Sequence, residues 1–178
     1  MKKTCLALAI TLVLAIFPVS AQAATASGTL TVTATVTGSI HLVFNTDPSG
    51  VTLTGTGTPT ATLAFGNVEA YGGCNTNVTC TPGASSFTAS SPVDVAVYEY
   101  NSSSASYTLK ANLGTNDATD TWSVGGTTIT TTATTITATG AYTTSGTGTN
   151  YAVQITIPYT VANGTNISNT IAYTATSN

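Results

Sequence analysis

Few side chains beyond the first two dozen residues could carry out chemistry. From residue 24 onward the chain has one lysine, Lys110, one histidine, His41, and no arginine. The acidic residues of the whole chain are Asp47, Glu69, Asp94, Glu99, Asp117 and Asp120. These acids form no glycoside-hydrolase motif, no Gly-x-Ser-x-Gly motif is present, and His41 has no partner close in sequence. We therefore expect a protein that is not an enzyme and needs no cofactor.

Two acids and the histidine are candidate metal ligands. Asp117 and Asp120, within Asn-Asp-Ala-Thr-Asp, could bind Ca²⁺ through their oxygens. Two carboxylates in such a segment more often form a turn. His41 is out of phase with its apolar neighbours and is expected to be exposed. No metal site is predicted.

The aromatic residues offer a candidate sugar site. Tyrosines at alternate strand positions can form a platform for a sugar ring, although they more often lie in the core and at its rim. The candidate contacts are Tyr98, Tyr100, Tyr107 and Trp122.

Two cysteines remain beyond residue 23. Cys74 and Cys80 are separated by five residues, with no histidine nearby and no Cys-x-x-Cys spacing. An even cysteine count in an exported chain favours a disulfide over a redox or metal pair. Because the loop is short, the bond should contribute only about 2–2.5 kcal/mol and fix one loop.

Residues 1–23 are typical of a secretory signal peptide. Lys2 and Lys3 form the basic start, residues 5–17 the apolar stretch, and Ala21-Gln22-Ala23 the cleavage site. The apolar stretch is too short for a membrane anchor. Loss of two lysines changes the formal net charge from −3 to −5. With one lysine left, the mature chain cannot neutralise a phosphate backbone, which excludes nucleic acid as a partner.

The mature chain has the composition and periodicity of an all-β protein. Threonine is abundant, whereas glutamate, lysine, leucine and methionine are scarce, which favours strands over helices. Apolar residues alternate in short runs separated by Gly, Asn, Ser and Pro. At residues 93–100 both faces are apolar, which predicts a covered central strand. Eight or nine such strands indicate an immunoglobulin-like Greek-key β-sandwich, and a closed barrel fits almost as well.

The first alternating run is unusually long. Residues 30–44 keep apolar side chains on even positions, whereas an ordinary strand has about 5–6 residues. Gly38 is a natural division between an N-terminal extension, residues 24–38, and a domain, residues 39–178. Residues 27–37 could pair within their own domain, remain free, or add as a strand to another subunit.

Three segments give the chain a resemblance to a known family. They are the alternating residues 30–36 after the cleavage site, Leu63-Ala-Phe65-Gly66, and the ending from Ile157-Pro158 through Asn163-Gly164 to Tyr173. Together they resemble archaic chaperone–usher pilins that share the spore coat protein U domain. Two features depart from the family pattern: the cysteines lie together in one loop, and Tyr173 is not next to last.

The resemblance implies a sandwich that lacks one strand. A periplasmic chaperone would fill the open core first, and the extension of the next subunit would then replace it. By position, the donor residues would be Leu30, Val32, Ala34 and Val36. The edge of the acceptor groove would carry Ile171, Tyr173 and Ala175. The chain would then be exported to the periplasm and assembled, through an outer-membrane usher, into a homopolymeric surface fibre.

Two other interpretations remain open. The extension could be an ordinary edge strand of a complete sandwich that acts as an extracellular carbohydrate-binding or cell-surface-binding module. The chain could also be a monomeric coat or surface-layer component without a ligand.

Overall fold

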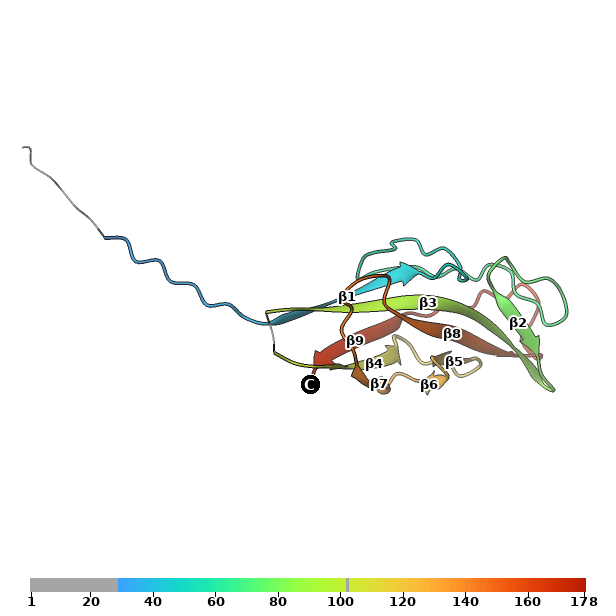
Figure 1. Ribbon diagram of the computed structural model, residues 1–178. Coiled ribbons are helices and arrows are strands. Elements are labelled where there is room, and N and C mark those ends of the chain that lie inside the picture. Colours follow the sequence, from blue (N-terminus) through green and yellow to red (C-terminus); the bar gives the residue numbers. More distant parts are fainter. Residues whose placement is uncertain (1–28, 102) are drawn as a thin grey trace, which may run out of the picture. The chain divides into compact units, whose positions relative to one another are not determined.

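A computed structural model describes residues 29–101 and 103–178 (Figure 1). The expected signal peptide, residues 1–23, and the first residues of the extension lie outside the described residues. The chain divides into two compact units, Met1–Ala34 and Thr35–Asn178. In the first unit, residues 29–34 are exposed and belong to no strand. Among the described residues there is no helix, hence none that could cross a bilayer.

The second unit is all-β, as predicted from the composition. The strands of the described residues are β1 (Ser39–Thr46), β2 (Thr79–Pro82), β3 (Ser86–Tyr100), β4 (Tyr107–Leu113), β5 (Thr121–Val124), β6 (Thr127–Ile129), β7 (Thr134–Gly140), β8 (Thr149–Pro158) and β9 (Ile171–Ser177).

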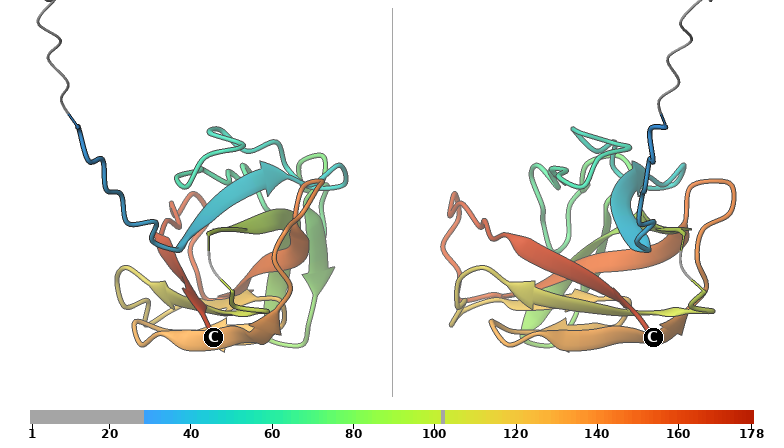
Figure 2. Two further views of the ribbon diagram at one scale, coloured as in Figure 1. Left: turned by 60° about the vertical axis from the view of Figure 1, so that its left-hand side comes forward. Right: turned by 90° about the vertical axis from the view of Figure 1, so that its left-hand side faces the viewer.

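The strands form two antiparallel sheets, as Figure 2 shows. The larger sheet has the order β1-β3-β8-β5-β6, and β2 pairs with β3 as well. The smaller sheet has the order β7-β4-β9. This arrangement is consistent with a β-sandwich.

Strand β3 organises the larger sheet. Its C-terminal half pairs with β1, its N-terminal half pairs with β2, and β8 pairs with residues 86–95. Val95, Ala96 and Val97 are fully buried, which confirms the predicted strand with two covered faces. Because Ser39 is opposite Tyr100 and Pro82 is opposite Phe87, the start of β1 and the end of β2 lie at opposite ends of β3.

The turn between β5 and β6 also agrees with the sequence. Gly125 and Gly126 have φ values of 55° and 79°. Two successive positive φ values are what a tight two-residue hairpin requires, and glycine adopts them without a steric penalty.

Several predicted elements were wrong in detail. Residues 51–53 and 61–65 alternate like strands but form only an isolated bridge, Thr54 with Thr62. The predicted loop at residues 72–83 contains β2. The predicted hairpin partner at residues 136–142 overlaps β7, which pairs with β4 instead. Pro158 does not confine β8 to an edge, because the proline is the last residue of a central strand.

The main core lies between the two sheets. Strand β4 places Tyr107, Leu109 and Ala111 on its inner face, each at most 1% exposed. The buried cluster also includes Val95, Val97, Leu113, Trp122, Val124, Ile129, Tyr151, Ile155 and Ile157. One side of this core, beside β9, is not closed.

Candidate functional site

Strand β9 is the edge of the smaller sheet. Among the described strands it pairs only with β4, from Ile171 opposite Leu113 to Ser177 opposite Tyr107. The predicted groove residues Ile171, Tyr173 and Ala175 are half-buried and pack against the main core. The alternate side chains are exposed. The other edge of β9 therefore offers unpaired main-chain groups beside a row of apolar side chains.

A cleft of about 820 Å³ opens beside this edge. Its apolar lining comes from both sheets and includes Val93 of β3, Val153, Ile155 and Ile157 of β8, and Trp122 of β5. One wall is formed by residues 61–68, and the other by residues 164–171. A cleft this large in the core of a small domain leaves apolar surface uncovered, which is unfavourable unless something fills it.

The wall at residues 61–68 has a strand's periodicity without a strand's pairing. Ala61, Leu63 and Phe65 are half-buried against the smaller core cluster, and the residues between them are exposed. The Asn75 side-chain amide donates a hydrogen bond of 3.0 Å to the Phe65 carbonyl. The wall is thus held by side-chain burial and a few hydrogen bonds.

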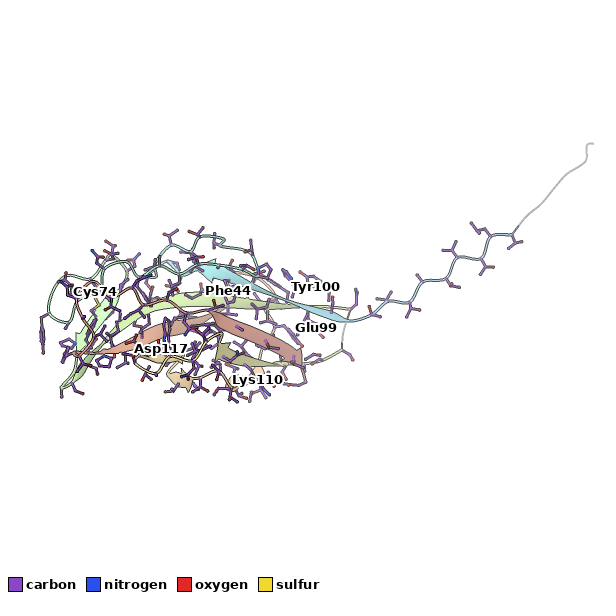
Figure 3. All side chains as sticks on the ribbon, turned by 180° about the vertical axis from the view of Figure 1, so that it is seen from behind. Phe44, Cys74, Glu99, Tyr100, Lys110 and Asp117 are labelled. Atoms are coloured by element: carbon purple, nitrogen blue, oxygen red, sulfur yellow. A yellow bond between two sulfur atoms is a disulfide. The ribbon has the colours of Figure 1, made fainter. Side chains whose placement is uncertain are left out.

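Phe44 and Tyr173 join the two sheets at the cleft. Their ring centroids are 5.1 Å apart and the rings are tilted by 68°, an edge-to-face contact. Phe44 lies on β1 (Figure 3). Burial, and to a lesser degree the nearby Tyr151, raise the pKa of Tyr173, so this hydroxyl stays protonated at neutral pH.

The predicted donor residues are exposed. Leu30, Val32 and Val36 are 86%, 80% and 73% exposed, and Ala34 is exposed as well. Residues 29–38 belong to no strand, so the alternative of an ordinary edge strand is not what the structure shows. Large aliphatic side chains with so much surface in water are costly to leave uncovered.

The cysteine prediction is confirmed. Cys74 and Cys80 form a disulfide with a Cα–Cα distance of 6.1 Å. This bond indicates an oxidising compartment, extracellular or periplasmic.

The acidic pair forms a turn. Asp117 accepts hydrogen bonds from the backbone N–H groups of Thr119 and Asp120 and from the Trp122 indole, at 2.9–3.0 Å and 2.8 Å respectively. The described residues contain no group of three or more potential metal ligands among His, Cys, Asp and Glu. His41 is exposed on β1, as expected.

The predicted sugar contacts do not form one surface. Tyr107 and Trp122 are only 1% and 6% exposed because they belong to the core, and Tyr98 is half-buried. Tyr100 alone of the four is strongly exposed, at 53%. Another aromatic group, Tyr71, Phe87 and Tyr159, was missed because its members are far apart in sequence and lie in no shared motif.

No family model, curated protein or solved structure matches the chain. Function must therefore be inferred from the cleft, the extension and the exposed aromatic residues.

Proposed function

We propose that the chain is a secreted structural subunit of a surface fibre. Each subunit inserts residues 27–37 into the cleft of a neighbour. In this proposal the domain is an immunoglobulin-like Greek-key sandwich that lacks one strand, and a donor strand completes it. The observation that carries the proposal is an exposed alternating extension on the same chain as an open apolar cleft beside an unpaired strand edge.

The dimensions of donor and acceptor agree. Residues 30–36 and the edge strand β9, Ile171–Ser177, each comprise seven residues, so every donor residue can face one of β9. Main-chain hydrogen bonds along the free edge of β9 would supply affinity. The side-chain alternation would then direct all four apolar donor residues to the same face.

The energetics favour insertion. Each leucine or valine moved from water into an apolar site contributes roughly 1.5–3 kcal/mol. The cleft lining supplies such a site, since Ile155, Ile157 and Trp122 are among its residues. The low charge also helps, because subunits packed along a fibre with few charges repel one another little.

The proposed pathway requires protection of the chain before assembly. An exposed apolar strand and an open cleft both promote aggregation. A periplasmic chaperone that occupies the cleft, and an outer-membrane usher that exchanges it for the next subunit, would meet this requirement. The disulfide is compatible with passage through the periplasm.

The donor assignment is tested by the phase of charged substitutions. Val32→Asp and Val36→Asp each place a carboxylate on the face that enters the cleft, so we expect export without polymers. The matched controls Thr33→Asp and Thr35→Asp place the same charge on the opposite face, so SDS-resistant ladders should persist. Electrophoresis without boiling and electron microscopy of the surface fraction provide the readout.

Two results would contradict the assignment. Filaments that survive both valine substitutions would show that residues 30–36 do not donate the strand. Equal loss of polymers in the threonine variants would show that added charge, and not its position, prevents assembly.

A further inference from the structure

Three aromatic rings gather at the end of β3 that is opposite to Ser39. They come from three separate parts of the chain: Tyr71 from the segment before the disulfide, Phe87 from β3, and Tyr159 from the residue after β8. The Tyr71 and Tyr159 centroids are 6.2 Å apart with rings 25° from parallel, and those of Phe87 and Tyr159 are 6.3 Å apart at 15°. We call these residues the aromatic stack.

The stack is exposed. Tyr71 and Tyr159 are 82% and 40% exposed, and Phe87 is half-buried. Among the described residues of the second unit, the only other large side chain with comparable exposure is Tyr100, which lies at the other end of β3. Figure 3 shows Tyr100 and Cys74, close in sequence to Tyr71, at opposite ends of this unit.

The rings are held in place before any ligand arrives. The Tyr159 hydroxyl donates a hydrogen bond of 2.9 Å to the Gly83 carbonyl, and its backbone N–H donates to Ser85 at 3.1 Å. Phe87 is fixed by pairing with Ile157 of β8. The Cys74–Cys80 disulfide closes the loop that follows Tyr71. Fixed rings lose little conformational freedom when a ligand binds.

A hollow of about 330 Å³ lies next to the rings. Phe87 and Tyr159 line it, and Glu69, Asn163 and Thr165 contribute polar groups. Its size and its mixture of apolar wall and few polar groups are those of a small-ligand site. The hollow shares residues 164–165 with the donor cleft, but the stack residues are not part of the cleft lining.

The charge around the hollow selects among ligands. Its one charged lining residue is Glu69, whereas the cations of the second unit, His41 and Lys110, lie on β1 and β4. An anionic ligand would find no partner of opposite charge and would be repelled by the carboxylate.

From these features the geometry points to a binding site for a neutral sugar ring, of the hexose or N-acetylhexosamine class. A pyranose has an apolar face of C–H groups bordered by hydroxyls. The C–H face fits against an aromatic ring, whose face carries partial negative charge. The hydroxyls can donate to the Glu69 carboxylate and exchange hydrogen bonds with Asn163 and Thr165. The site does not depend on the proposed polymer.

The test uses the exported chain in titration calorimetry with two neutral probes, cellotetraose and tetra-N-acetylchitotetraose, and with tetragalacturonate as the anionic comparison. We expect at least one neutral probe to bind and the anionic one not to bind. Tyr71→Ser should weaken binding about tenfold, because it removes an exposed stacking face, whereas Tyr71→Phe should bind almost as the original chain does. Tyr100→Ser is the matched control and should leave affinity unchanged.

Each contrary outcome overturns the site. These outcomes are the failure of both neutral probes to bind, tighter binding of tetragalacturonate, or affinity that Tyr71→Ser leaves unchanged. Since Tyr71 is a surface residue, its substitution should not unfold the chain, and a melting curve checks this. Polymer formation is scored separately on the same samples, so failure of the fibre proposal would not be mistaken for failure of this one.

Discussion

At the scale of single residues, the turn before β5 contains two acids with opposite tendencies. Burial opposes ionisation of Asp117, but hydrogen bonds from Asp120, Trp122 and Thr119 together outweigh it and lower its pKa. Burial and the neighbouring charge of Asp117 raise the pKa of Asp120. One carboxylate oxygen of Asp120 is buried without a hydrogen-bond partner in the described structure. Asp117 therefore stabilises the turn when ionised, whereas Asp120 strains it.

We expect Asp120→Asn to stabilise the protein at neutral pH. A group with a raised folded pKa supplies stability below its unfolded pKa and loses that stability as pH rises through the folded pKa. Asparagine does not ionise, so the variant should melt higher at pH 7 and match the original near pH 3. Because Asp120 is partly exposed, the gain should be less than about 1 kcal/mol.

Thermal unfolding between about pH 3 and 8 measures this difference, and Asp117→Asn serves as the opposite control. Its pKa is lowered, so its stabilisation is present above the unfolded pKa and lost as pH falls through the folded value. Asp117→Asn should therefore be less stable than the original at pH 7. An Asp120→Asn variant that melts lower at pH 7 would disprove the account of the turn.

At the scale of elements, pairing and side-chain periodicity separate in this chain. The wall at residues 61–65 alternates as strictly as a strand, yet it is held by one bridge and by apolar burial. Strand β2 lacks such alternation, yet it pairs regularly with β3. The disulfide begins in the irregular segment before β2 and ends within it, at Cys80. It thereby ties an otherwise weakly held loop to the larger sheet.

Removing the disulfide should loosen this loop without abolishing the fold. For the double variant Cys74→Ser, Cys80→Ser we expect a loss of about 2 kcal/mol, because the bond closes only a short loop. Urea denaturation, followed by tryptophan fluorescence of the buried Trp122, measures the loss. An unchanged midpoint would show that β2 pairing alone fixes the loop. Complete unfolding would show that the bond supports the whole sandwich.

At the scale of the whole molecule, the unfilled cleft and the exposed extension belong to one chain. In the proposed fibre each subunit uses both features at once, one as acceptor and one as donor. The contact is then head-to-tail, and such a contact does not close into a symmetric dimer but continues into a fibre. A domain whose cleft is empty should also be less stable than one whose cleft is filled.

Deletion of the extension should therefore stop polymerisation and leave an acceptor. We compare the chain from Ala24 to Asn178 with one that begins at Ser39, by size exclusion with light scattering. The longer chain should form SDS-resistant ladders. The shorter one should not, and a synthetic peptide of residues 27–37 should bind to it and raise its melting temperature.

The same peptide with aspartate in place of Val32 is the control and should not bind. Two stable monomers with equal melting temperatures would instead show that the sandwich is complete by itself. In that case the extension would have no acceptor in this chain, and the fibre proposal would fail.

A large part of the architecture could be predicted from local sequence. Threonine-rich alternation predicted an all-β chain, Val93, Val95 and Val97 predicted the covered strand, and the Gly-Gly pair predicted the β5–β6 hairpin. Each of these depends on residues within a few positions of one another. The interpretation of residues 61–65 as a strand was wrong because alternation reports which side chains are buried, not whether the backbone has a neighbour.

The sequence by itself determined the class of fold, the disulfide pair, the scarcity of charge and the apolar phase of residues 30–36. All of these are set by composition or by neighbours along the chain. Only the tertiary structure decided that Trp122 is buried, that β9 keeps a free edge, and that Tyr71, Phe87 and Tyr159 meet. These facts depend on which distant strands pair and in what register, and local periodicity does not specify long-range pairing.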